Sequence, residues 1–128
     1  REVIDDTYAD KSSVKRVLFC SGKVYYDLMQ HQQDNNRKDV AIVRIEQLYP
    51  FPMKQMKETL KQYSGAKEYF WVQEEPENMG YWSHLFTRHP EVFVEFGLIA
   101  RPMSATPATG LAKRHAKEQE DIIKKSFE

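Results

Sequence analysis

Apolar residues along the chain fall into short continuous runs that alternate with segments of helical spacing. A run such as Val40–Ile45 is typical of a strand covered on both faces of a sheet. It must end before Pro50, because proline cannot donate to a sheet ladder. The other predicted strands are Val14–Cys20, Glu68–Gln73, Gly97–Pro102 and a short edge strand at Glu2–Asp5.

Two segments place apolar residues on one helical face. The first follows the turn Ser21-Gly22-Lys23 and fades at Asp34. The second begins at Pro52, which suits the first helical position, and ends at Gly65, a usual residue past a helix end. Their predicted buried residues are Val24, Tyr25, Leu28 and Met29 in the first, and Met53, Met56, Leu60 and Tyr63 in the second.

A closing helix is predicted over Leu111–Phe127. Its exposed face would carry Lys113, Arg114, Lys117 and Glu118. Its buried face would carry Ala112, Ala116, Ile122, Ile123 and Phe127.

The remaining segments are shorter. Glu74–Gly80 is predicted to be an acidic loop, and Ser104–Gly110 a loop of small residues. Tyr81–Thr87 is predicted to form a short helix, whereas Glu91–Phe96 is ambiguous between helix and strand. Strands that alternate with helices call for a mainly parallel sheet with helices on both faces. The predicted fold class is therefore α/β, a three-layer α/β/α sandwich.

The composition of the chain argues against some classes of function. The chain has 128 residues with 19 basic and 19 acidic side chains, so a general electrostatic grip on nucleic acid or an anionic membrane is not expected. Its single cysteine, Cys20, ends an apolar run and is predicted to be a buried structural thiol. No apolar run approaches the roughly 20 residues needed to span a bilayer. The start at Arg1 suggests a piece of a longer protein.

Two positions near the predicted carboxyl ends of strands could carry chemistry. Ser21 and Lys23 lie in a strand-to-helix turn, where free N–H groups favour an anion, so a phosphate contact and a plain solvated turn are both open. Arg44 interrupts an apolar strand and must be paired or solvated. Glu46 and the pair Glu74-Glu75 are its candidate partners, and a ligand or interface contact is the alternative.

Catalytic signatures are missing from the sequence. The four histidines lack the i, i+4 zinc-helix spacing, and no nucleophile elbow or dinucleotide fingerprint is present. Glu74 and Glu75 are neighbours in an extended segment and point to opposite faces, so a structural or interface role is expected rather than acid/base catalysis.

Several strings resemble a known family. The chain is similar to the C-terminal domain of the thiamine-diphosphate-dependent dehydrogenase component of the 2-oxoglutarate dehydrogenase complex. The resemblance covers about Val14 to Glu128. The strings that carry it are C-S-G-K-V-Y-Y-D-L, D-V-A-I-V-R-I-E-Q-L-Y-P-F-P, W-V-Q-E-E-P-E-N-M-G and A-T-P-A-T-G.

The resemblance implies a fold and a parent enzyme. The fold would be of the transketolase C-terminal type, a mixed five-stranded sheet of order 1-3-2-4-5 with strand 1 antiparallel. The full protein would be a homodimer that decarboxylates 2-oxoglutarate on thiamine diphosphate and magnesium, in the tricarboxylic acid cycle. It would pass the succinyl group to the lipoyl-bearing succinyltransferase component. This fragment would hold no cofactor, no metal and no catalytic residue, and would be inactive alone.

The resemblance also implies regulation, since some relatives bind acetyl-CoA or AMP. Gln47 and Lys54, with Ser21 and Lys23, are the residues expected to hold such a nucleotide. In a purely structural domain, Tyr81 and Trp82 would instead be interface anchors, with Arg44, Glu74 and Glu75 as structural or interface residues. A free-standing small α/β nucleotide-binding or interaction module is the remaining alternative.

The chain is expected to divide into a linker with a possible edge strand, residues 1–13, and a domain, residues 14–128. The location would be cytoplasmic in a bacterium, which we favour, or the mitochondrial matrix in a eukaryote.

Overall fold

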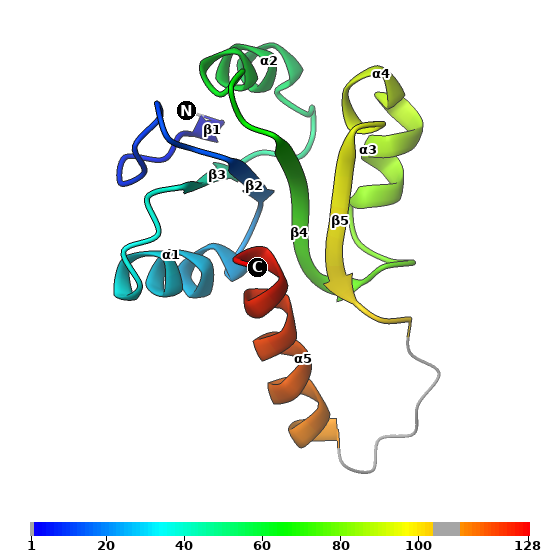
Figure 1. The fold of residues 1–128 in the computed structure, drawn as a ribbon. Helices are drawn as coiled ribbons and strands as arrows, with labels where there is room; N and C mark the ends of the chain where they lie inside the picture. The colour runs from blue at the N-terminus through cyan, green and yellow to red at the C-terminus, as the bar shows by residue number, and fades with distance from the viewer. Residues whose placement is uncertain (1, 104–110) are drawn as a thin grey trace.

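Five strands form one mixed sheet in the computed structural model, which describes residues 2–103 and 111–128 (Figure 1). Their order is β1-β3-β2-β4-β5, with β1 antiparallel to β3 and the other neighbours parallel. This confirms the predicted order and the antiparallel edge strand. The strands are β1 (Val3–Ile4), β2 (Arg16–Cys20), β3 (Val40–Ile45), β4 (Glu68–Pro76) and β5 (Phe96–Arg101).

Helices cover both faces of this sheet and complete the predicted three layers (Figure 1). Alternate residues of β2 point to opposite faces, so Phe19 enters one core cluster and Leu18 the other. The Phe19 cluster is closed by α2, α3 and α4, and the Leu18 cluster by α1 and α5. The helices are α1 (Val24–Asp34), α2 (Met53–Gln62), α3 (Trp82–Arg88), α4 (Pro90–Phe93) and α5 (Leu111–Ser126).

The structure corrects the predicted start of the acidic loop and settles the ambiguous segment Glu91–Phe96. The acidic loop was expected to begin at Glu74, but β4 continues through Glu74 and Glu75 to Pro76, with an irregular register against β5 after Val72. The ambiguous segment Glu91–Phe96 divides into the end of α4 and the start of β5. The predicted loop Ser104–Gly110 lies outside the described residues.

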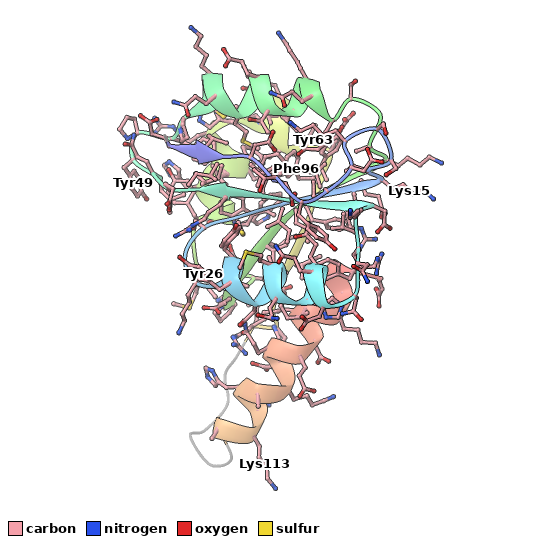
Figure 2. All side chains as sticks on the ribbon, turned by 90° about the vertical axis from the view of Figure 1, so that its left-hand side faces the viewer. Lys15, Tyr26, Tyr49, Tyr63, Phe96 and Lys113 are labelled. Atoms are coloured by element: carbon pink, nitrogen blue, oxygen red, sulfur yellow. The ribbon has the colours of Figure 1, made fainter. Side chains whose placement is uncertain are left out.

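The predicted buried face of the closing helix is wrong in its first half. Ala112 and Ala116 are exposed, whereas Ile122 is fully buried. Figure 2 shows the reason: the first half of α5 extends beyond the sheet, with Lys113 near its far end. Glu118, which was expected on the solvated face, is only partly exposed.

The C-terminal end of α5 is held by two arginines, one in β2 and one in the connection between α1 and β3. Arg16 donates from Nη1 to the carbonyl oxygens of Lys125, at 2.9 Å, and Ser126, at 3.1 Å. Arg37 donates from Nη1 to the carbonyl oxygen of Phe127 at 2.8 Å. Cations at these final carbonyls satisfy acceptors that have no partner within the helix.

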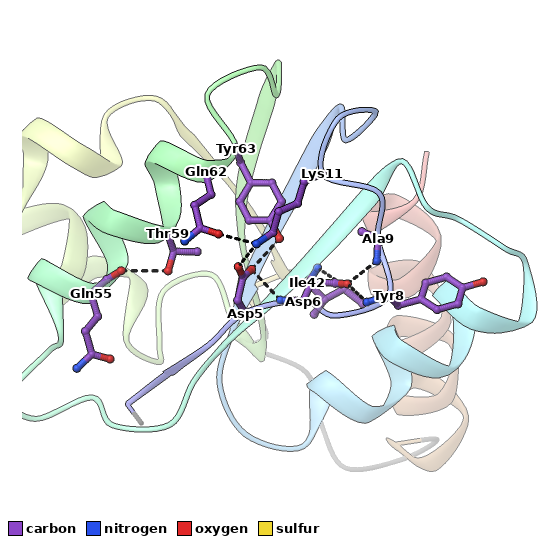
Figure 3. Close-up of polar contacts among 10 residues, drawn as sticks. All are labelled: Asp5, Asp6, Tyr8, Ala9, Lys11, Ile42, Gln55, Thr59, Gln62 and Tyr63. Carbon is purple, nitrogen blue, oxygen red and sulfur yellow. Dashed lines mark hydrogen bonds and ion pairs between the residues drawn. The ribbon is translucent and has the colours of Figure 1, made fainter.

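The segment after β1 is held by two aspartates (Figure 3). Asp5 accepts from the hydroxyl of Tyr63 at 2.7 Å and pairs with Lys11 at 2.7 Å. Asp6 accepts from the backbone N–H of Ile42, in β3, at 2.8 Å. The carboxylate of Asp6 thus supplies an acceptor to β3 where the short strand β1 has already ended.

Candidate functional site

The carboxyl ends of β4 and β5 open into a cavity of about 910 Å³. The start of α1 and the first half of α5 form its other walls. Open α/β sheets bind ligands at this edge, and the volume suits a ligand of nucleotide size. The charged side chains that line it are Lys23, Asp27, Glu74, Glu75, Arg101, Arg114 and Glu118, and the imidazole of His115 lies among them.

Gln119 joins the walls of this cavity. Its Oε1 accepts from Arg101 Nη2 at 2.6 Å, and its Nε2 donates to Asp27 at 2.9 Å and Glu74 at 3.1 Å. Arg101 also lies 3.4 Å from Glu118. One amide therefore connects α5 with α1, β4 and β5.

Lys23 and Arg114 are the cations most open to a ligand in this cavity. Both side chains are exposed, although Arg114 lies 3.7 Å from Glu118, whereas Arg101 is engaged by both Gln119 and Glu118. Lys23 stands at the start of α1, where the helix dipole also favours an anion. The arrangement can attract a small anionic molecule, although the carboxylates restrict where its charge can lie.

A second cavity, of about 270 Å³, lies beside the first and shares Glu75 with it. Ser21 and Tyr81 also line it. Its wall is shaped by the buried amide of Gln73, which donates to the carbonyl oxygens of Pro76 at 3.0 Å and Met79 at 2.8 Å. Gly80, at φ +77°, leaves room for that amide, since a Cβ there would lie 3.0 Å from it.

Arg44 lies beside Glu46, which was one of its two predicted partners; the other was the pair Glu74-Glu75. Its Nε is 3.2 Å from a Glu46 carboxylate oxygen, but the N–H is not aligned for a hydrogen bond within the described residues. The guanidinium also lies 4.9 Å from the ring centroid of Tyr25 and 5.1 Å from that of Tyr26. Its charge is therefore balanced by Glu46 and by two aromatic faces, and Glu74 bonds to Gln119 instead.

The four residues expected to hold a nucleotide are not brought together. Lys23 lines the larger cavity and Ser21 the smaller one. Gln47 donates to the carbonyl oxygen of Pro50 at 2.9 Å, and Lys54 is exposed on α2. Neither Gln47 nor Lys54 lines either cavity.

Tyr81 and Trp82, the expected interface anchors, are both half-buried within the chain. Tyr81 donates its hydroxyl to the Leu48 carbonyl oxygen at 2.6 Å, and burial raises the pKa of this phenol. Trp82 packs edge-on against Phe93. Two exposed rings lie beside them: Tyr49, labelled in Figure 2, is 5.0 Å from Tyr81 between ring centroids, and Phe86 is 5.7 Å from Trp82.

Sequence reasoning missed the residues that organise this edge, Gln73, Arg101 and Gln119. Arg101 could have been suspected, since it is a charge at the end of the last strand. Gln119 gave no signal, because an amide on a charged helix face looks solvated until its partners are known. Cys20 is fully buried, as predicted, and burial raises the pKa of its thiol to about 12.

Residues 2–103 and 111–128 contain neither a cluster of metal-binding side chains nor a membrane-spanning helix. No group of three or more His, Cys, Asp or Glu side chains there could hold a metal ion. In the same part of the chain, no helix is long and apolar enough to cross a membrane.

Comparison with known proteins identifies the family. Residues 1–127 match the sequence model of the family described as "2-oxoglutarate dehydrogenase C-terminal". The chain belongs to this family. It is 47% identical, over 89% of its length, to the 2-oxoglutarate dehydrogenase E1 component of Haemophilus influenzae, and covers 12% of that protein. It is 40% identical, over 99% of its length, to the 2-oxoadipate dehydrogenase complex component E1 of Danio rerio, and covers 14% of it.

The 2-oxoglutarate dehydrogenase C-terminal domain thus spans about one-eighth of these curated relatives. A solved structure described as "Split gene transketolase, inactive beta4 tetramer" shares the fold, with a TM-score of 0.58. It is 10% identical, and the match covers 90% of this chain and 40% of that one. The predicted transketolase C-terminal type of fold is confirmed.

Proposed function

We propose that this domain belongs to a larger E1 enzyme that decarboxylates 2-oxoglutarate on thiamine diphosphate and magnesium. The observation that carries the proposal is the family match over residues 1–127. The enzyme would pass the succinyl group to a lipoyl-bearing succinyltransferase. The family resemblance puts the cofactor site in another part of the complete protein, and we propose that thiamine diphosphate and magnesium bind there.

The test is an activity measurement on the complete protein. Thiamine-dependent decarboxylation is measured with 2-oxoglutarate and, separately, with 2-oxoadipate, because the relatives bear both names. Preference for 2-oxoglutarate supports the proposal, and preference for 2-oxoadipate corrects the substrate. No thiamine-dependent activity with either would overturn it.

We also propose that the domain acts as a scaffold that orders an E1 homodimer and does no chemistry of its own. Exposed apolar side chains support this role, since such groups are typical of surfaces that meet a partner. They are Ile4, Tyr26, Tyr49, Met79, Phe86, Val94 and Met103. Deletion of these 128 residues from the complete protein should abolish both dimerisation and activity. A fully active, dimeric deletion variant would refute the scaffold.

A second candidate role is binding of a regulatory nucleotide such as acetyl-CoA or AMP, which the 910 Å³ cavity beside Lys23 favours. Calorimetry with each nucleotide tests it, comparing Lys23→Ala with the control Lys54→Ala. Loss of binding in Lys23→Ala alone places the nucleotide in the cavity. Loss in Lys54→Ala alone places it at the start of α2, and no binding to the unmodified chain removes the role.

The location of the protein also stays a proposal: bacterial cytoplasm, or the mitochondrial matrix if the source is a eukaryote. Detection of the native protein in fractionated cells tests this. Recovery in a membrane or secreted fraction would contradict it.

A further inference from the structure

The cavity of about 270 Å³ at the carboxyl edge of the sheet is walled in part by three aromatic residues. Tyr49 follows β3, Trp71 lies within β4, and Tyr81 comes directly before α3. The rings of Tyr49 and Tyr81 are 5.0 Å apart between centroids, with their planes at 70° to each other. They therefore form a corner rather than a stack, and Tyr49, which is 72% exposed, keeps much of its ring open to a ligand.

The other aromatic walls are held in place by hydrogen bonds. The hydroxyl of Tyr81 donates to the carbonyl oxygen of Leu48 at 2.6 Å. Trp71 is fully buried, and its indole N–H donates to Oε1 of Gln73 at 3.1 Å. These walls are formed before a ligand arrives, which lowers the entropic cost of binding.

The charge in this cavity has one sign. Glu75 is the one charged residue in its lining among the described residues, and no lysine, arginine or histidine lines it. The Glu75 carboxylate forms no ion pair within residues 2–103 and 111–128. In the neighbouring 910 Å³ cavity, Arg101 and Arg114 are drawn instead to Glu118, at 3.4 Å and 3.7 Å. A carboxylate without a cationic partner therefore lines the same small cavity as the aromatic rings.

We propose that this cavity binds an alkylammonium group, carried by a small free amine or by a lysine side chain. A cation is attracted to the negative face of an aromatic ring, and the carboxylate of Glu75 supplies the opposite charge. The hydroxyl of Ser21, another lining residue, can accept from the N–H groups of the ammonium. A volume of about 270 Å³ suits one such chain and is small for a nucleotide. Binding at this site does not depend on the proposed E1 activity.

Other classes of ligand fit the cavity less well. A phosphate or a carboxylate would meet Glu75 with no basic side chain in the lining to offset the repulsion. A magnesium or calcium ion prefers several oxygen ligands, and the lining offers one carboxylate. A neutral apolar molecule could fill the space but would gain nothing from the carboxylate, so a neutral analogue is the decisive comparison.

The first test is an NMR titration of the 128-residue chain with n-butylammonium chloride, followed at the indole N–H signals of its two tryptophans. Trp71 lines the cavity and Trp82 does not, so the signal of Trp82 is an internal control. We expect a saturable shift of the Trp71 signal alone. n-Butanol has nearly the same shape without the charge and should bind about tenfold more weakly. Equal binding of n-butanol, no saturable shift, or the same shift with sodium chloride would overturn the proposal.

The second test repeats the titration on variants of the lining. Glu75→Gln removes the charge and Tyr49→Leu removes the exposed ring, and each should weaken the binding of n-butylammonium by about fivefold or more. Glu77→Gln is the matched control, because Glu77 is an exposed carboxylate outside this lining. Circular dichroism checks that each variant is folded. An unchanged affinity in Glu75→Gln or in Tyr49→Leu, or an equal loss in Glu77→Gln, would reject the site.

A third titration identifies the source of the ammonium group. The probe is a capped lysine, Nα-acetyl-lysine N-methylamide, compared with n-butylammonium. If the capped lysine binds at least as tightly, the cavity accepts the lysine side chain of a polypeptide. If n-butylammonium alone binds, the ligand is a free amine, and if neither binds, the proposal is wrong.

Discussion

Asp6 is expected to be among the most costly polar residues to remove. One carboxylate oxygen accepts from the N–H of Ile42 and from Nε2 of Gln32, each at 2.8 Å. The other accepts from the N–H groups of Tyr8 and Ala9, each at 2.6 Å. Four donors from three parts of the chain thus depend on one side chain.

The cost of Asp6→Ala follows from which donors can find another acceptor. Tyr8 and Ala9 are partly exposed and can turn to water, whereas Ile42 and Gln32 are buried. A buried donor left without its acceptor costs about 1–3 kcal/mol. Gln32 keeps its second bond, to the carbonyl oxygen of Val40 at 2.8 Å, so the total for Asp6→Ala should be about 3 kcal/mol.

Urea unfolding followed by the fluorescence of Trp71 and Trp82 measures this loss. Asp6→Asn keeps one acceptor oxygen, which can face Ile42 and Gln32 while the amide N–H₂ replaces the oxygen that served Tyr8 and Ala9, so it should lose less free energy than Asp6→Ala. The control is Asp10→Ala, because the Asp10 carboxylate accepts from Ser12 within its own exposed turn. A free energy of unfolding for Asp6→Ala equal to that of Asp10→Ala would refute the reasoning.

Two further outcomes are expected. Gly97→Ala should lower the free energy of unfolding by about 1–3 kcal/mol, since its Cβ would lie 2.5 Å from the ring of Phe70. Gly65→Ala, with no atom within 4 Å, is the matched control, and equal losses would contradict this account. Cys20 should resist a thiol-specific disulfide reagent at pH 8, because its pKa of about 12 keeps it protonated and burial blocks access. It should react fully in concentrated urea, and fast labelling of the folded chain would show that the site opens.

The strands and the first two long helices could be predicted because their signals are local. The apolar run of β3 and the prolines after it define one element, and the spacing of Met56 and Tyr63 defines the buried face of α2. The closing helix shows the limit of this reasoning. Ala112 and Ile122 share a helical pattern, but only a three-dimensional arrangement decides which of them the sheet covers.

The hydrogen bonds between polar side chains were harder to predict, because their partners lie far apart in the sequence. Gln119 joins Asp27, 92 residues away, and Asp6 joins Ile42, 36 residues away. Arg44 could be given Glu46 as a partner because the two residues are two positions apart in the sequence, at the end of β3. Its contacts with Tyr25 and Tyr26 come from α1, and no spacing in the sequence indicated them.

The central claim is that this domain orders an E1 homodimer, and the mass of the complete protein tests it most directly. Light scattering would compare the complete protein with a variant that lacks these 128 residues, at the same concentration. The account predicts a dimer for the first and a monomer, without 2-oxoglutarate decarboxylation, for the second. A deletion variant that remains a dimer would contradict it.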